Sequence, residues 1–304
     1  MKTLVTGVTG YVGSRLAERL LRDRHEVRGL TRQSSASPPG IELVTGDAVS
    51  GDGLERALDG VAVAYYLIHS MEPSIDGAFV ARERRSAENF THAADAAGVE
   101  RIVYLGGLIP KDGPVSDHLA SRLEVEHVLL GSSACSVALR ASIVIGARSR
   151  SFRFLVRLIE RLPVLAIPGW GTNRTNPVDE RDVIEMLARA ATADGVCGRS
   201  FDVGGPDTVS YERLIQLIRD HMLLERPTVA LGSLTLTPIA SRISALITGE
   251  QHELIGPLME SLENDLLVSG DSAAEAFGVR LHSLDSAIEH ALREWEAQEP
   301  LAAR

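Results

Sequence analysis

Short apolar runs alternate with amphipathic stretches along the first two thirds of the chain. Apolar runs of four to eight residues are typical of buried strands, and apolar residues spaced three and four apart are typical of helices. We predict strands at 2–6, 26–31, 41–45, 62–68, 101–105, 135–140 and 199–203. We predict helices at 11–23, 52–59, 76–97, 117–131, 151–161, 180–193 and 210–222. This alternation predicts an α/β fold, in which a doubly wound parallel sheet carries helices on both faces.

The pattern changes after residue 205, where prolines interrupt helical segments and no further strand pattern stands out. We predict apolar-faced helices at 234–248, 254–262 and 284–295. In open α/β sheets, ligands lie at the carboxyl ends of the strands. We therefore predict a nucleotide-binding domain over 1–204, in which 147–175 contributes to the substrate side. A smaller, mainly helical lobe over 205–304 is expected to cover the substrate.

A glycine-rich segment, Thr6-Gly7-Val8-Thr9-Gly10-Tyr11-Val12-Gly13, joins the first predicted strand to the first predicted helix. In this context, such a segment binds the pyrophosphate of a dinucleotide. Gly7 allows the tight turn, Gly10 lets the backbone approach the phosphates, and Gly13 lets the helix pack on the strand. The helix amides and the positive end of the helix dipole then face the phosphates. We predict a Rossmann-type site for NAD or NADP formed by Thr6, Gly7, Thr9, Gly10, Tyr11, Val12 and Gly13.

The end of the second predicted strand distinguishes the two cofactors. NAD-selective folds place a carboxylate there to bind the ribose 2′-hydroxyl, whereas an arginine accommodates the 2′-phosphate of NADP. This chain has Arg32 and Ser34 and no carboxylate at that point, so we predict NADP(H) rather than NAD(H). Asp47 and Ala48 follow the third strand, where Asp47 either contacts the adenine or caps the next helix. The end of the fourth strand, Leu67-Ile68-His69, is expected near the nicotinamide.

The composition is that of an ordinary globular protein, with 44% hydrophobic and 24% charged residues among 304. The net charge of −10 argues against nucleic-acid binding, and no apolar run reaches the length of a membrane span. The first predicted strand begins at residue 2 and leaves no room for a signal peptide, so we expect a cytoplasmic protein. Cys135 and Cys197 lack the spacing of a metal motif, and we predict buried thiols rather than a metal site or a disulfide.

The glycine loop, Gly46-Asp47 and the strand alternation resemble the short-chain dehydrogenase/reductase superfamily, in the form used by its extended and atypical members. The segments 65–71, 118–122 and 176–183 are similar to an atypical NAD(P)H-binding subgroup close to NmrA-like proteins. The resemblance covers nearly the whole chain, strongly over 1–205 and loosely beyond it. It implies a Rossmann-type fold and a bound nicotinamide dinucleotide.

The expected catalytic residues of that superfamily are replaced in this chain. Catalytic members use a tyrosine and a lysine four residues apart on one helix, with a serine at the end of the preceding strand. Here His118 and Arg122 keep the spacing and therefore share one helix face. Gly106 and Gly107 stand where the serine is expected. The usual triad is absent from these positions.

Two interpretations of this pair remain open. In the first, His118 donates a proton to the substrate, because an imidazole titrates near neutral pH, and activity falls as the pH rises through its pKa. Arg122 then binds the ribose or an anionic substrate. In the second, the helix keeps only its packing and cofactor roles, and His118 is hydrogen-bonded locally. Both interpretations allow Arg122 to contact the cofactor.

Candidate substrate contacts follow the sixth predicted strand. Arg153, Arg157 and Arg161 share one helix face. This face either binds an anionic substrate through Arg153 or is a solvated basic face, paired with Glu160 or with a partner subunit. Trp170 either stacks on a ligand or closes the core. Three strand tyrosines are expected in the core rather than in proton transfer: Tyr65, Tyr66 and Tyr104.

We therefore expect an NADP(H)-dependent oxidoreductase that reduces a carbonyl or activated double bond of a small organic substrate by hydride transfer. Two alternatives stay open: a non-catalytic NADP(H)-sensing regulatory or scaffold protein, as the NmrA-like resemblance implies, and an epimerase or dehydratase with a retained cofactor. The helices at 76–97 and 117–131 form a dimer face in some members of the superfamily. A homodimer and a single-chain core both fit the apolar residues Leu123, Val125, Val128 and Leu129.

Overall fold

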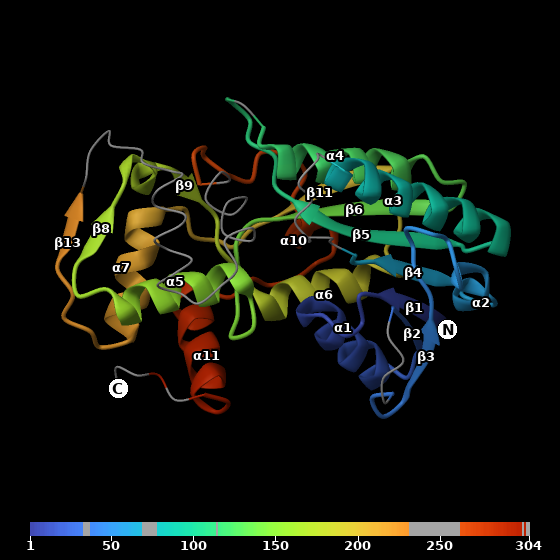
Figure 1. The fold of residues 1–304 in the computed structure, drawn as a ribbon, viewed down its shortest axis with the longest axis horizontal. Coiled ribbons are helices and arrows are strands. Elements are labelled where there is room, and N and C mark those ends of the chain that lie inside the picture. The colour runs from blue at the N-terminus through green and yellow to red at the C-terminus, as the bar shows by residue number, and fades with distance from the viewer. Residues whose placement is uncertain (33–36, 69–77, 114, 231–261, 300, 302–304) are drawn as a thin grey trace.

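A computed structural model describes residues 1–32, 37–68, 78–113, 115–230, 262–299 and 301 (Figure 1). Seven parallel strands form its central sheet, in the order β11-β6-β5-β4-β1-β2-β3. The strands are β1 (Lys2–Thr6), β2 (Glu26–Thr31), β3 (Ile41–Thr45), β4 (Val63–Tyr66), β5 (Arg101–Gly107), β6 (Cys135–Ala141) and β11 (Arg199–Val203). The α/β fold predicted from the sequence is confirmed.

Helices cover both faces of this sheet (Figure 1). One face packs on α1 (Tyr11–Arg22), α6 (Glu180–Ala190) and α10 (Ala273–Ala276). The other packs on α2 (Leu54–Leu58), α3 (Ala78–Ala97) and α4 (Asp117–Leu130). Successive strand residues alternate between the two cores, as Tyr65 and Tyr66 do, because strand side chains point to opposite faces. No helix in the described part of the chain is long and apolar enough to cross a membrane.

A second hydrophobic core lies beyond the carboxyl edge of the sheet (Figure 1). It is built from α5 (Arg150–Arg161), α7 (Tyr211–His221) and α11 (Leu284–Glu296), around Trp170 of the short helix η1 (Gly169–Thr172). The segment between β6 and α6 therefore packs with C-terminal helices. The helices predicted at 234–248 and over most of 254–262 lie outside the described residues.

Six short strands pair in twos around this second core, and the sequence pattern predicted none of them. They are β7 (Val144–Ile145) with β10 (Val178–Asp179), β8 (Leu165–Ile167) with β13 (Thr228–Ala230), and β9 (Arg174–Thr175) with β12 (Val209–Ser210). Each is two or three residues long, too short to show an alternating pattern. Two of these strands, β12 and β13, follow residue 205, where no strand pattern stands out in the sequence.

Buried carboxylates attach the C-terminal segment to the sheet domain. Asp182 at the start of α6 accepts hydrogen bonds from the backbone N–H of His282 (2.8 Å) and is 2.6 Å from its Nδ1. Asp202 on β11 accepts from the backbone amides of Ser269 and Gly270 at 2.9 and 2.8 Å. These bonds fix the chain that leads into α11 against the nucleotide-binding side of the molecule.

The prediction for the two cysteines is wrong, because Cys135 and Cys197 form a disulfide. Cys135 begins β6, and Cys197 lies just before β11, its neighbour in the sheet. Strand pairing therefore brings their Cα atoms to 4.7 Å across a sequence separation of 62 residues. Local sequence spacing does not reveal such a contact.

Removing this disulfide is expected to destabilise the fold, because the bond restricts the unfolded chain. For a loop of this length the loss is about 4 kcal/mol. Urea unfolding of the Cys135→Ser/Cys197→Ser variant should show a lower midpoint than the oxidised wild type. A reductant should lower the wild-type midpoint and leave the double variant unchanged; an equal response of both proteins would contradict the assignment.

Candidate functional site

The glycine loop between β1 and α1 brings the start of the helix against the end of the strand. Gly7 has a φ of 63°, a conformation that favours glycine, and a Cβ there would lie 3.0 Å from the Leu67 carbonyl oxygen. A Cβ at Gly13 would lie 2.2 Å from the Gly7 carbonyl oxygen. These contacts exclude any larger side chain at Gly13 without movement of the backbone. The turn and the close packing predicted for Gly7 and Gly13 are therefore present.

The N-terminus of α1 is suited to a phosphate group. The first amides of a helix have no partner within the helix, and they carry the positive end of its dipole. Gly10 is the N-cap residue, so no side chain caps these amides, and the first turn contains no acidic residue. Gly10 is in extended conformation and leaves the approach to the backbone open. The residues of the loop thus fit the diphosphate of a dinucleotide.

Thr6 joins the loop to the neighbouring strand β4. Its hydroxyl donates to the Tyr65 carbonyl oxygen (3.1 Å) and accepts from the Leu67 amide (2.8 Å). Leu67 is buried and Ile68 is half-buried, so the end of β4 is held beside the glycine loop. Thr9 is exposed, and Val12 packs partly on the sheet core. Two residues predicted to contact the cofactor, Ser34 and His69, lie outside the described residues.

The loops after β2 and β3 form the far end of the expected cofactor site. Arg32 is exposed directly after β2. Asp47 Oδ1 accepts from the Val49 amide at 2.7 Å, and the N-cap residue of α2 is Gly53. The helix-capping alternative for Asp47 is therefore wrong, since its carboxylate closes a local turn. Buried Ala48 is held in this turn through its carbonyl oxygen, which accepts from Asn89 Nδ2 at 3.0 Å.

His118 and Arg122 contact each other on α4. Arg122 Nε donates a hydrogen bond to His118 Nε2 at 3.0 Å. The His118 ring stacks on Phe79 of α3, with 6.4 Å between ring centroids and 25° between planes. A Cβ at Gly107 would lie 4.0 Å from Arg122 Nη1, so the guanidinium lies beside the end of β5. The pair therefore lies at the carboxyl edge of the sheet, where the superfamily places its catalytic helix.

The His118 imidazole is neutral at physiological pH. Burial and the nearby positive charge of Arg122 lower its pKa to about 3. The expectation that this group titrates near neutral pH is therefore wrong, because burial removes the solvent that would stabilise the imidazolium and Arg122 adds a like charge beside it. The local hydrogen bond expected in the second interpretation is present.

The candidate substrate residues Trp170 and Arg153 contact other parts of the second core. Trp170 is 6% exposed and meets Tyr211 edge-on, with 6.2 Å between ring centroids. The Arg153 guanidinium lies 4.4 Å from the centre of the Trp295 ring and 3.5 Å from Glu299. Both side chains thus have structural partners in the described residues.

The apolar residues of α4 that fit either a dimer face or a single-chain core, and the three strand tyrosines, lie mostly in the sheet core. Val125 and Leu129 are buried, and Val128 packs partly on the same core. The prediction that three tyrosines are core residues is confirmed: Tyr65, Tyr66 and Tyr104 are each at most 2% exposed. Leu123 is half-buried on α4.

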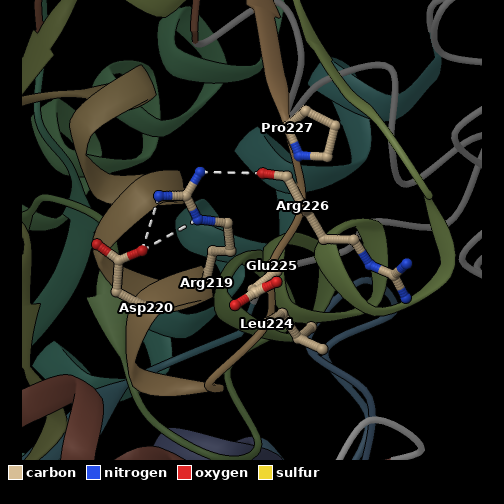
Figure 2. A pocket seen from close by; sticks show the side chains of 6 residues that line it. All are labelled: Arg219, Asp220, Leu224, Glu225, Arg226 and Pro227. Atoms are coloured by element: carbon tan, nitrogen blue, oxygen red, sulfur yellow. Dashed lines mark hydrogen bonds and ion pairs between the residues drawn. The ribbon is translucent and has the colours of Figure 1, made fainter.

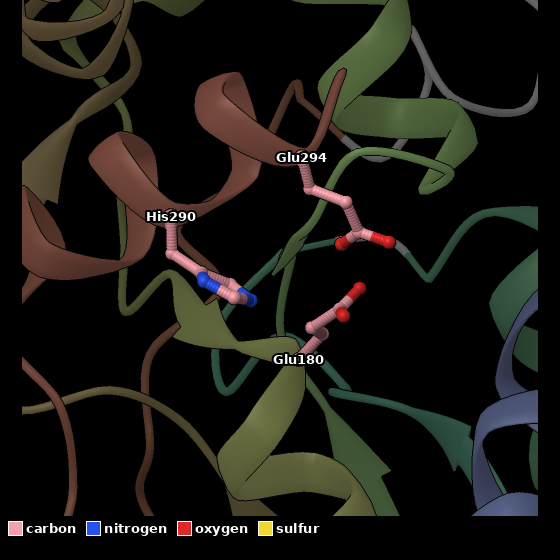
Figure 3. A group of neighbouring side chains, drawn as sticks. All are labelled: Glu180, His290 and Glu294. Atoms are coloured by element: carbon pink, nitrogen blue, oxygen red, sulfur yellow. The ribbon is translucent and has the colours of Figure 1, made fainter. Parts of the chain in front are cut away.

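A cluster of charged groups at the start of α1 was missed by the sequence analysis (Figure 3). Glu180 of α6 faces His290 and Glu294 of α11, and their ligand-type atoms lie within 4.8 Å of one another. Arg15 of α1 forms ion pairs with Glu294 and, at 3.7 Å, with Glu180. Arg15 thus supplies a positive charge between these carboxylates. The cluster joins α1, which follows the glycine loop, to the C-terminal helix α11.

Glu180 is the most buried member of this cluster, at 6% exposure. Its Oε2 and the hydroxyl of Tyr11 are buried and have no hydrogen-bond partner among the described residues. Both atoms abut Gly146, where a Cβ would come within 2.3 Å of Oε2. Burial raises the pKa of Glu180 to about 7, against the opposing effect of Arg181. Local sequence carries no signal for this group, because its members lie on three helices from distant parts of the chain.

A surface hollow of 410 Å³ lies at the C-terminal end of α7 (Figure 2). Arg219 within it donates to the Arg226 carbonyl oxygen and to the Asp220 carboxylate, at 3.0 and 2.7 Å. Its guanidinium is therefore engaged by the protein. The hollow lies away from the glycine loop, and it is not part of the candidate site.

Glu180→Gln should remove a pH dependence of stability. A glutamate whose pKa is raised by folding stabilises the fold below its unfolded pKa, and this contribution is lost as the pH rises through the folded value. Wild type should therefore lose about 1–3 kcal/mol relative to Glu180→Gln between pH 4.5 and pH 8. Urea unfolding across this range measures the difference, and parallel stability curves would contradict the burial of a titrating Glu180.

Glu185→Gln is the matched control on the same helix. Burial raises the pKa of Glu185, but hydrogen bonds from Arg189 and Arg19 outweigh it and lower the pKa. A group with a lowered pKa stabilises the fold at high pH and loses this contribution as the pH falls. Relative to wild type, the Glu185→Gln variant should therefore be least stable at the upper end of this pH range. Its stability difference from wild type thus changes with pH in the opposite direction to that of Glu180→Gln.

Comparison with known proteins agrees with this geometry. A family model described as the NAD dependent epimerase/dehydratase family matches residues 3–204. The (4-alkanoyl-5-oxo-2,5-dihydrofuran-3-yl)methyl phosphate reductase of Streptomyces griseus is 29% identical over 233 residues, which span 74% of this chain and 74% of that protein.

Two other similarities show less, because one covers a smaller part of the chain and the other has a lower sequence identity. The 3-beta-hydroxysteroid dehydrogenase of Mycolicibacterium neoaurum is 33% identical over 114 residues, which span 34% of this chain and 31% of that protein. The chain thus matches about a third of that relative's length. A UDP-glucuronic acid 4-epimerase from Bacillus cereus, solved with UDP-glucuronic acid and NAD, has a TM-score of 0.73 and 18% identity. The alignment covers 98% of this chain and 100% of that one, and it shows a shared fold.

Proposed function

Because the chain belongs to the NAD-dependent epimerase/dehydratase family, we propose that it is an NADP(H)-dependent oxidoreductase acting on a small organic substrate. The reaction is reduction of a carbonyl group or an activated double bond. The glycine loop carries this proposal, since its uncapped helix amides and close backbone contacts suit a dinucleotide diphosphate. The similarity to a Streptomyces griseus protein named as a reductase supports the reaction type.

Arg32 supports NADP(H) over NAD(H). It is exposed directly after β2, where the adenosine ribose lies in folds of this kind. A guanidinium binds a phosphate through two charge-assisted hydrogen bonds, whereas a carboxylate is the usual partner of an unmodified ribose. The chain has no carboxylate between Thr31 and Ser37. The 2′-phosphate of NADP(H) therefore has a suitable partner.

The two parts of the molecule divide the work in this proposal. Residues 1–204 bind the cofactor, and 205–304 together with 147–175 enclose the substrate at the carboxyl edge of the sheet. The bound cofactor supplies the hydride, and the protein orients it and excludes water. Arg122 lies at the edge of β5 and binds the ribose or the substrate. Trp170 and Arg153 are held by packing and charge contacts in the second core, and their contact with the substrate stays a prediction.

A second candidate is an NADP(H)-sensing protein without turnover. The observation that favours it is the replacement of all three usual catalytic residues, by Gly106 or Gly107, His118 and Arg122. Under this alternative the nucleotide-bound state is recognised by a partner protein. An epimerase or dehydratase with a retained cofactor is the third candidate, favoured by the family description. Cofactor that stays bound through purification would support it.

The direct test is single-turnover absorbance at 340 nm, with NADPH and a panel of quinones, enals and ketones. Oxidation that requires one acceptor class, faster with NADPH than with NADH, is the expected result. Stoichiometric NADPH binding without oxidation by any acceptor would refute the reductase and support the sensor.

Arg32→Ala should weaken NADPH binding and leave NADH binding nearly unchanged. Loss of a charge-assisted phosphate contact is worth about 1.5–3 kcal/mol, or about 10–100-fold in the dissociation constant. Calorimetric titration with both nucleotides measures this change. Arg22→Ala is the matched control, because it removes another exposed arginine. Arg22 ends α1, at the opposite end of that helix from the glycine loop. Equal effects of both variants would show that Arg32 contributes only general charge.

A further inference from the structure

We infer that His118 is a positioning residue whose ring accepts the Arg122 Nε–H, and that Arg122 presents its terminal nitrogens to the substrate oxygen as a fixed cation. This inference rests on the proposed function. It replaces proton donation by His118 with charge stabilisation by Arg122. It also explains why a histidine and an arginine keep the spacing of the superfamily's tyrosine and lysine.

The direction of the hydrogen bond fixes the state of the ring. A guanidinium has donors and no acceptor, so Nε2 of His118 carries no proton when Arg122 Nε donates to it. The proton of the neutral ring is then on Nδ1. A second proton on Nε2 would place two donors against each other and break this bond.

Among the described residues, the groups around His118 offer no counter-ion for an imidazolium. From α3, Phe79 stacks on the ring, and Glu83 is engaged by the Ser121 hydroxyl at 2.7 Å. From β5, the Tyr104 hydroxyl donates to the Arg122 carbonyl oxygen at 3.1 Å. On β6, Arg140 is paired with Glu126 of α4. Asp117, in the first turn of α4, is solvent-exposed. Burial and Arg122 both favour the neutral ring.

Arg122 has terminal nitrogens to offer. Its Nε is used by His118, and within the described residues no hydrogen bond engages its Nη atoms. Nη1 lies 4.0 Å from the position that a Cβ at Gly107 would occupy, so it lies beside the end of β5. A planar guanidinium held through Nε directs its Nη atoms in a fixed plane.

The chemistry of reduction suits a fixed cation at this place. A bound nicotinamide cofactor would supply the hydride and its electron pair to the substrate carbon, and negative charge would then develop on the substrate oxygen. Arg122 would donate hydrogen bonds to that oxygen. Water then supplies the proton. Donors placed where charge develops are among the largest contributions to catalysis.

Two substitutions at His118 separate positioning from proton transfer. Glutamine places an acceptor oxygen near the position of Nε2, whereas leucine has a similar volume and no acceptor. We expect His118→Gln to retain the single-turnover rate within about threefold, and His118→Leu to lose about 10–100-fold, in keeping with one misplaced donor. Thermal unfolding of both variants checks that the fold persists. Loss of activity in His118→Gln equal to that in His118→Leu would overturn positioning.

The pH dependence supplies a second readout that a merely structural role would not move. Between pH 6 and pH 7, the single-turnover rates of wild type and His118→Gln should depend on pH in the same way, without an inflection that occurs in wild type alone. An NMR titration of the histidine Cε1–H signals, with the His118 signal identified by its loss in His118→Gln, should show no change between pH 5 and pH 8. A midpoint near 6.5 in both experiments would restore His118 as the proton donor.

The two proposals fail in distinguishable ways. If wild type fails to oxidise NADPH with every acceptor in the panel, the proposed function fails, and the role of Arg122 toward a substrate fails with it. If wild type turns over and the His118 signal titrates with the rate, only the positioning inference fails. The NMR experiment needs no substrate, so the bond between His118 and Arg122 is decided in either case.

Discussion

The contact between the start of α1 and the end of β1 is the constraint on which the nucleotide site depends. The Gly7 carbonyl oxygen would lie 2.2 Å from a Cβ at Gly13, so only glycine permits this approach. The approach directs the uncapped N-terminus of α1 toward the carboxyl edge of the sheet. A diphosphate binds where helix amides and a positive dipole end meet, and this geometry provides both.

The same helix also connects the two parts of the molecule. Tyr11 and Arg15 lie in its first two turns, next to Glu180 of α6 and Glu294 of α11. Glu180 is buried, and its Oε2 has no hydrogen-bond partner in the described part of the chain, which costs stability when the group is charged. The position of the C-terminal helix is therefore linked to the helix whose N-terminus we propose binds the phosphates. On the other side of the sheet, α4 carries an arginine fixed by a neutral histidine in place of the tyrosine and lysine of the superfamily.

The sheet and the glycine loop were predictable from the sequence because their signals are local. All seven sheet strands and most helices were located from apolar runs and helical spacing within a few residues. The contacts that the sequence did not predict join distant segments. The disulfide spans 62 residues, and the cluster around Glu180 is formed by residues of three helices. The lowered pKa of His118 likewise depends on burial under Phe79 and on Arg122, which spacing alone does not give. The short strands around the second core carry too few residues for any periodic pattern.

The most direct test of the account is calorimetric titration of NADPH into wild type and the Gly10→Ala variant. Gly10 has a φ of −76°, which alanine also adopts, and its Cβ would lie 3.0 Å from the Gly7 carbonyl oxygen, so the fold should survive with a small adjustment. The added methyl group would stand where the backbone approaches the diphosphate. The account predicts stoichiometric binding by wild type and a loss of affinity of at least about tenfold in a variant that unfolds at nearly the same temperature. Equal affinity in both proteins would contradict dinucleotide binding at the glycine loop.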